Sequence, residues 1–260
     1  MSRPDIVLLV LAAIVAVVWY AVAREWPAGV RLRRGWIRAK PYALAYMQSS
    51  PATFAYAAVI MLTTWIVAGS NQRLTSAVLR DQSTNLSNLR HHAIDVLLRS
   101  AFWSGSSYAL PTIALLAFVL APAEFWLGTR RAVFVFAIGH VGATVLTAAG
   151  IALALHFGRA PRGIERTIDV GVSYGAVCLA GVLVYRLSPP WRYAAAIGLL
   201  VAFGIRAGLG DGFSDYGHVA ALLLGYACYP FTRAPEVRER RGVPIYRPWL
   251  RAPEREWQAG

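Results

Sequence analysis

Long runs of apolar residues alternate with short, arginine-rich connections along most of this chain of 260 residues. A helix needs about 20 mostly apolar residues to cross the hydrocarbon core of a bilayer. Seven stretches meet this requirement, and we expect each to form a transmembrane helix. They are residues 6–23, 51–69, 103–121, 132–157, 169–187, 193–209 and 216–232. The pattern therefore predicts an all-α fold, a polytopic transmembrane helix bundle.

The first stretch has two interpretations. Residues 21–23 (Ala-Val-Ala) offer the small-residue pattern of a signal-peptide cleavage site. However, the flank before the stretch carries Asp5 as well as Arg3, and a strongly basic segment follows at 24–40. We therefore interpret 6–23 as an uncleaved N-terminal transmembrane helix.

The composition supports a membrane protein, because 57% of the residues are hydrophobic. The net charge of +13 rests almost entirely on arginine, since Lys40 is the only lysine. In a soluble chain this charge would suggest nucleic-acid binding. Here the arginines flank apolar stretches, so membrane topology and anionic lipid headgroups explain them better. We expect the lipid bilayer, and no nucleic acid, as a partner. The preference for arginine is typical of a GC-rich bacterial genome.

The arginines also predict the orientation. The connection 24–40 and the tail 233–260 hold nearly half of them, and seven spans put these two segments on the same side of the membrane. Because positive charge is retained in the cytoplasm, the N-terminus is expected outside and the C-terminus in the cytoplasm. The external connections are then 70–102, 158–168 and 210–215. The predicted location is a bacterial plasma membrane.

Two connecting segments have a pattern of their own. From Leu86 to Leu97 apolar residues recur at helical spacing, with His91 and His92 between them. This spacing predicts an amphipathic helix in the outer interface, with the two histidines facing solvent. The tail 233–260 is rich in arginine and proline, which predicts an extended or disordered segment near the inner leaflet.

The sequence offers little support for a metal site or a cofactor site. Cys178 and Cys228 both fall inside predicted spans, where they are expected to be small buried residues rather than a disulfide. No Cys/His spacing suggests a metal site, and residues 211–215 are too short and too poor in ligands for a calcium loop. We expect no metal and no cofactor.

A serine and a histidine fall at matching depths in two different spans. The fifth span runs inward from the outside, so Ser173 lies roughly 6 Å below Asp169 at about 1.5 Å per residue. The seventh span also runs inward, and His218 lies about 4.5 Å below Asp215. We therefore expect both side chains at one level, just inside the outer surface.

Small residues on both spans permit a close approach of the two helices. They are Gly171, Gly175 and Gly181 on the fifth span, and Gly217, Ala220, Ala221 and Gly225 on the seventh. A serine hydroxyl becomes nucleophilic when a neighbouring imidazole accepts its proton. Ser173 and His218 are therefore candidates for a catalytic dyad.

Each of these polar residues also has a structural interpretation. Taken alone, Ser173 is better explained as a packing residue, and only its pairing with His218 supports a nucleophile. His140, near the middle of the fourth span, is expected to make an interhelical hydrogen bond. Asp215 either orients His218 or caps the seventh helix, together with Ser214, and we favour the cap.

At these positions the sequence resembles a known family. Residues 171–173 read Gly-Val-Ser, and Gly181 follows eight residues after the serine. A small residue precedes His218, and Ala221 and Gly225 follow it three and seven positions later. These residues resemble the motifs of the rhomboid family of intramembrane serine proteases. Its fourth core helix carries Gly-x-Ser-Gly, and its sixth carries Ala-His followed by small residues.

The resemblance covers about residues 46–232 and implies a six-helix rhomboid-like core. Residues 1–45 would then form the added N-terminal transmembrane helix and a basic cytoplasmic linker, and 233–260 a basic cytoplasmic tail. The family further implies Ser173 as nucleophile and His218 as general base, then acid. A long external first core loop is also a rhomboid feature.

The sequence departs from the family pattern in three places. Tyr174 replaces the glycine after the serine, and a register shifted by one residue would put Tyr174 in the nucleophile position; the distance to Gly181 favours Ser173. The His-x-x-x-Asn motif that stabilises the oxyanion corresponds here to Tyr108 and Thr112, whose hydroxyls are donors. The first core loop lacks the Trp-Arg pair of many members.

Three functions compete. The first is an intramembrane serine protease that cleaves single-span membrane proteins near the outer interface. The second is a pseudoprotease that binds transmembrane helices as clients without cutting them, which Tyr174 and the missing His-x-x-x-Asn motif favour. A small transporter is weaker, because the chain shows no inverted repeat and few buried charges.

Overall fold

The structure, a computed structural model, describes most of the chain. The described residues are 13, 16–68, 72–103, 109–159, 163–164, 172–210 and 212–243. Every regular element within these ranges is helical, and none of these residues forms a strand. The prediction of an all-α fold is therefore confirmed.

The chain divides into two compact units, Met1–Ser49 with Pro244–Gly260, and Ser50–Val243. In the first unit, helix α2 spans Pro27–Ser49, so the basic connection after the first predicted span is largely helical. Residues 16–23 are helical as well, whereas most of the remainder of the predicted span 6–23 lies outside the described residues. The end of the tail, 244–260, lies outside them too.

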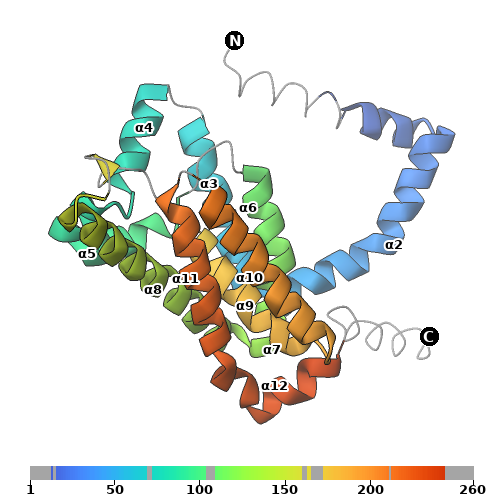
Figure 1. Cartoon of the computed structure of the whole chain (residues 1–260). Coiled ribbons are helices and arrows are strands. Elements are labelled where there is room, and N and C mark those ends of the chain that lie inside the picture. The colour runs from blue at the N-terminus through green and yellow to red at the C-terminus, as the bar shows by residue number, and fades with distance from the viewer. Residues whose placement is uncertain are drawn as a thin grey trace. The chain divides into compact units, whose positions relative to one another are not determined.

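The second unit contains the remaining helices (Figure 1). They are α3 (Pro51–Ala68), α4 (Gln72–Asp81), α5 (Leu86–Ser100), α6 (Ala109–Leu115), α7 (Ala121–Leu127), α8 (Thr129–His156), α9 (Ser173–Leu183), α10 (Trp191–Leu209), α11 (Phe213–Ala227) and α12 (Pro235–Glu239). A π-helical turn, Leu116–Leu120, joins α6 to α7, so the predicted third span is interrupted. Short 3₁₀ turns follow α9, α11 and α12.

Two of the described helices are long and apolar enough to cross a membrane, Thr129–His156 and Trp191–Leu209. Three shorter apolar segments are Pro51–Ile66, Pro111–Leu127 and Ser173–Arg186. The seventh predicted span is also shorter than expected, because α11 ends at Ala227 and a 3₁₀ turn follows. The arrangement of six core spans plus one stays a prediction.

The surface of α10 is that of a membrane helix. Ile197, Val201 and Ile205 follow one another at intervals of four residues and are 63%, 52% and 56% exposed. Residues four apart lie on one face of a helix, so these side chains form a continuous apolar stripe. Such a stripe is unfavourable in water but is the normal outer surface of a helix in lipid.

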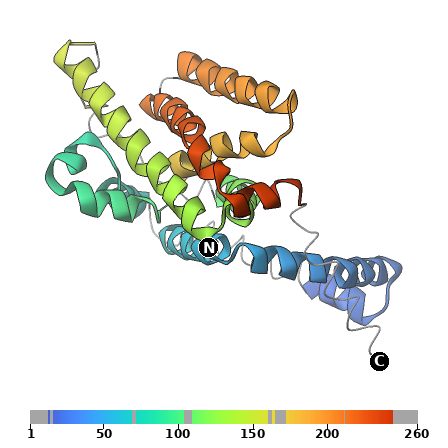
Figure 2. The same cartoon turned by 90° about the horizontal axis from the view of Figure 1, so that it is seen from below.

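Helices α8, α9 and α11 pack against one another at the centre of the second unit, and α10 packs against α11 (Figures 1 and 2). The approach of α9 and α11 is close enough to exclude side chains. A Cβ atom at Gly181 would lie 2.8 Å from the Leu222 carbonyl oxygen, and one at Gly225 would collide with the Cys178 carbonyl. Glycine is thus required at both positions, because only hydrogen leaves room for the facing backbone.

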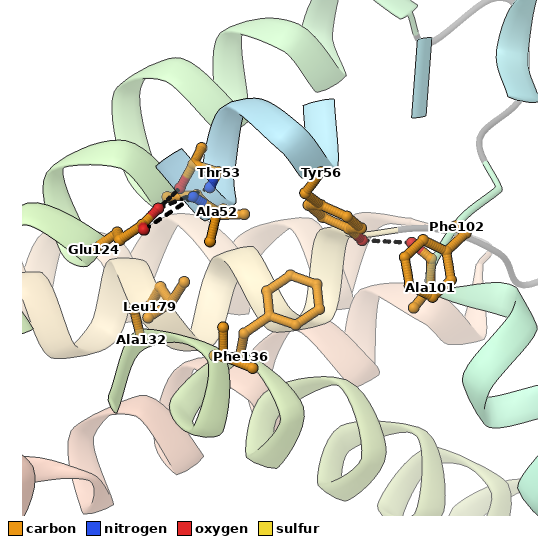
Figure 3. Close-up of a pocket in the computed structure, with 11 residues that line it drawn as sticks. Ala52, Thr53, Tyr56, Ala101, Phe102, Glu124, Ala132, Phe136 and Leu179 are labelled. Atoms are coloured by element: carbon orange, nitrogen blue, oxygen red, sulfur yellow. Dashed lines mark hydrogen bonds between the residues drawn. The ribbon is translucent and has the colours of Figure 1, made fainter. Parts of the chain in front are cut away.

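A buried carboxylate joins three helices on the other side of the core. Glu124 of α7 is 3% exposed. It accepts hydrogen bonds from the backbone N–H groups of Ala52 (3.1 Å) and Thr53 (2.7 Å), and from the hydroxyls of Thr53 (2.7 Å) and Thr129 (2.8 Å). The negative charge therefore sits at the N-terminus of α3, where the helix dipole stabilises it. Figure 3 shows the hydrogen bonds of Glu124 with Ala52 and Thr53, and the hydrogen bond from Tyr56 to the Ala101 carbonyl.

Two expectations about the connecting segments meet different outcomes. Helix α5 covers the segment predicted to be an amphipathic helix, and His91 and His92 are exposed as expected. The prediction of an extended or disordered tail is wrong for the first part of the tail, because residues 235–242 form α12 and a 3₁₀ turn. The physical reason is packing: Val237 is 1% exposed, and its carbonyl accepts a hydrogen bond from the Trp126 indole at 3.0 Å.

The glycine contact predicts a specific loss of stability. Gly225→Ala is expected to lower the free energy of unfolding by about 1–3 kcal/mol, because the added methyl group pushes α9 and α11 apart. The measurement is thermal or chemical unfolding in detergent. Gly204→Ala on α10 is the matched control, since its Cβ position has no atom within 4 Å, and it is expected to leave stability unchanged or slightly raised. Equal effects of the two variants would contradict the requirement for glycine.

The Glu124 network predicts a second loss. Glu124→Ala leaves the N-terminal N–H groups of α3 without an acceptor, at a cost of about 1–3 kcal/mol for each buried donor. Glu124→Gln keeps one acceptor oxygen and should be milder. Unfolding of both variants is compared with Glu239→Ala, which removes an exposed carboxylate of the same kind. A Glu124→Ala protein as stable as the Glu239→Ala protein would show that the network contributes nothing.

Candidate functional site

The first turns of α9 and α11 meet at the level of Tyr174 and His218. Their rings are 5.1 Å apart between centroids and stand edge to face, at an interplanar angle of 71°. The contact is tight, because a Cβ atom at Gly217 would collide with the Tyr174 hydroxyl and lie 2.7 Å from Oγ1 of Thr147. Both helices run in the same direction from this point, since Gly181 further along α9 faces Leu222 and Gly225 of α11.

The His218 imidazole is enclosed but not fully hydrogen-bonded. Its side chain is 15% exposed, and Phe203 of α10 packs on it with the ring centroids 5.9 Å apart. The Nδ1 atom is buried and has no hydrogen-bond partner among the described residues. The Asp215 carboxylate is 3.9 Å from Nδ1, which is too long for a hydrogen bond but close enough for an electrostatic interaction.

Asp215 has a stronger partner in Arg206. The Arg206 Nε donates to the Asp215 carboxylate at 2.6 Å, across the connection between α10 and α11. The interpretation of Asp215 or Ser214 as a helix cap is wrong, because Gly212 precedes the first residue of α11 and no side chain caps it. Asp215 already lies in the first turn of the helix, where its charge complements the dipole.

Ser173 is the first residue of α9 and is half-buried. It lies one helical turn before Val177, which belongs to a buried cluster with Leu222. His218 lies one turn before Leu222, so both candidates continue the faces that meet in this cluster. Among the described residues, the aromatic rings of Tyr174 and Phe203 pack against the His218 ring.

A cavity of about 480 Å³ opens beside this site. Residues of α8 and α11 line it, including Thr147 and Tyr216. Thr147 also touches the position of Gly217, and its buried Oγ1 has no hydrogen-bond partner in the described part of the chain. The site therefore borders a cavity into whose lining the Thr147 hydroxyl brings a polar group that is open to a further hydrogen bond.

Other predicted residues fall in different places. Tyr108, Gly171 and Asp169 lie outside the described residues, and so does Asp211. Thr112 is buried in α6. Among the close-packing candidates on α9, Gly175 lies against Phe136 of α8, whose ring occupies the space where a Cβ would be.

His140 makes the interhelical hydrogen bonds that were expected. Its Nε2 is 3.2 Å from the Ser100 hydroxyl and 3.0 Å from the Leu97 carbonyl, which links α8 to α5. The two cysteines are buried, as predicted, and both are free thiols in this structure. Within the described ranges, no group of three or more His, Cys, Asp or Glu side chains is arranged to hold a metal ion.

Sequence reasoning missed three participants in the site. Arg206 was given no role in the site from the sequence, although opposite charges on either side of a short connection can signal an ion pair such as the one it forms with Asp215. Phe203 lies in an apolar run, and nothing in that run indicates that its ring packs on His218. Tyr174 appeared as a change to the family motif, whereas the structure makes it the aromatic partner of His218.

Comparison with known proteins supports the family resemblance. No curated protein and no solved structure matches the chain. Residues 45–238, however, match the profile of a family described as rhomboid-like protein. This range contains both helices of the candidate site and covers well over half of the sequence. The chain therefore belongs to the rhomboid-like protein family.

Proposed function

We propose that this rhomboid-like membrane protein is an intramembrane serine protease in which Ser173 is the nucleophile and His218 the general base. The observation that carries the proposal is the contact between Tyr174 and His218. It brings the first turns of α9 and α11 together directly beside Ser173. A serine and a histidine on adjoining helix ends are the minimum that acyl transfer needs.

The proposed reaction proceeds in two steps. The His218 imidazole takes the Ser173 proton while the hydroxyl oxygen attacks the scissile carbonyl carbon, and the tetrahedral intermediate collapses as His218 protonates the leaving amine. A water molecule, deprotonated by the same imidazole, then releases the acyl group and restores the serine. A small rotation of the Ser173 side chain is compatible with this role, because hydrogen bonds of catalytic groups often tighten only when substrate is bound.

Two neighbours support the imidazole in this proposal. The Asp215 charge, 3.9 Å from Nδ1, favours the imidazolium that forms during attack. Arg206 holds that carboxylate in place from the side facing solvent. Asp215 is thus an orienting and stabilising residue rather than a proton acceptor.

The oxyanion would be stabilised by hydroxyl donors. Tyr108 and Thr112 occupy the positions where the family carries histidine and asparagine. Loss of one good oxyanion donor costs about 10²–10³ in rate. We therefore expect an enzyme with tyrosine and threonine in place of histidine and asparagine to be slow. We propose single-span membrane proteins as substrates, cleaved near the outer interface of the plasma membrane. The N-terminus lies outside and the C-terminus in the cytoplasm.

The same contact also favours a second function. Tyr174 follows Ser173 where the family has glycine, and its ring packs directly on His218. A histidine that is held by two aromatic rings is well placed for packing. These features favour a rhomboid-like pseudoprotease that binds transmembrane helices without cutting them.

A fluorophosphonate probe distinguishes the two functions, because it labels only a serine with an activated hydroxyl. The protease predicts labelling of the purified wild type, its loss in Ser173→Ala, and a fall of about 100-fold or more in the labelling rate of His218→Ala. Ser188→Ala and His156→Ala are matched controls that change the same residue types elsewhere in the chain. Both should label as the wild type does.

Two outcomes would refute the protease. One is a folded wild type, verified by its unfolding transition, that the probe does not label. The other is labelling that survives Ser173→Ala. Binding of a single-span membrane protein by an unlabelled wild type would then support the pseudoprotease.

A further inference from the structure

A basic cavity lies at the arginine-rich end of the helix bundle. Its volume is about 340 Å³, and it is enclosed by the 3₁₀ turn after α9, the start of α10, the turn after α11, and α12. Four arginines line it, and none of the lining residues is acidic. They are Arg192, Arg233, Arg238 and Arg241. A cavity of this size is in the range that holds a small ligand or a headgroup.

The arginines are held by neutral groups. Arg192 and Arg241 both donate to the carbonyl of Leu187, at 3.2 Å and 2.9 Å. Arg192 also stacks over the ring of Tyr185, with its guanidinium carbon 5.9 Å from the centroid. Carbonyls and rings orient a guanidinium but do not cancel its charge. Two positive charges are thus fixed side by side, and neither forms an ion pair with any of the described residues.

The other two arginines add to this field. Arg233 stacks over the ring of Tyr229 at 5.0 Å. The Arg238 side chain makes no hydrogen bond or ion pair with any of the described residues. The same helix carries two carboxylates. Glu236 is turned to Arg131, with an N–O distance of 3.4 Å, and Glu239 is exposed and does not line the cavity. Since like charges repel, the cluster is favourable when an anion is shared among them.

The chemistry of the cavity selects a phosphate group. A guanidinium presents planar donors that match phosphate oxygens, and several such donors converge here. The position indicates where the phosphate comes from. Trp191 and Tyr193 flank Arg192 and are 69% and 62% exposed, as is typical of aromatic residues at the membrane–water interface. Basic pockets at this level bind anionic lipid headgroups.

We propose that the cavity lined by Arg192, Arg233, Arg238 and Arg241 binds the phosphate of an anionic lipid headgroup. The bound lipid links α10 to the turn after α11 and to α12, so it fastens the C-terminal segment to the bundle. This inference does not depend on proteolysis, because the cavity contains neither Ser173 nor His218.

Lipid binding to the detergent-solubilised full chain tests the proposal. Native mass spectrometry measures the binding of phosphatidylglycerol and of phosphatidylcholine, and unfolding scans measure the stabilisation by each. The wild type is expected to bind phosphatidylglycerol about tenfold or more tightly than phosphatidylcholine. Arg192→Gln with Arg241→Gln should remove this preference, whereas Arg80→Gln with Arg90→Gln, which removes the same charge from α4 and α5, should keep it.

A milder variant keeps the test valid if the double variant does not fold. Arg238→Gln breaks no hydrogen bond among the described residues and should weaken phosphatidylglycerol binding on its own. Inorganic phosphate provides the second arm: competition with the lipid supports a phosphate site, and binding as tight as that of the lipid identifies free phosphate as the occupant. Equal binding of both lipids, or no difference between the two double variants, overturns the proposal.

Discussion

The packing of α9 directly against the backbone of α11 is the constraint on which the rest of this structure depends. Gly181 and Gly225 bring the two helices to a separation that no side chain allows. At that separation the first turns of both helices are forced together, and Tyr174 must lie on His218 and Gly217. Because lipid offers no hydrophobic driving force between helices, this contact relies on van der Waals packing along the glycines. The site is thus a consequence of the glycine pattern.

Much of this arrangement follows from the sequence. The apolar runs identify the helices, and the direction of the fifth and seventh runs puts residues 173 and 218 at one level. The sequence does not determine how α9 is rotated about its own axis. Neighbouring residues on a helix differ by about 100° in direction. Ser173 and Tyr174 both lie between Gly171 and Gly175, so the glycines do not distinguish them. Only the packed structure shows that the Tyr174 ring takes the place against His218.

Polar contacts over long distances were the hardest to foresee. Glu124 interrupts an apolar run, and an acidic residue in such a run signals a specific partner. Its partners, however, are backbone groups about seventy residues away, which no sequence pattern marks. The tail shows the same difficulty. Its arginines and prolines predict disorder, yet Pro235 begins α12, where a proline is well tolerated, and one buried valine fixes the segment.

The π-helical turn at Leu116–Leu120 affects how this chain should be compared with its relatives. A π turn contains one more residue than an α turn. Each side chain after Leu120 therefore points in the direction that an uninterrupted α-helix would give to the next residue along the chain. An alignment with an uninterrupted helix therefore needs a gap inside these five residues. Without that gap, residues on one side of the turn, either Thr112 or Glu124, would be matched to the wrong column and assigned a neighbour's role.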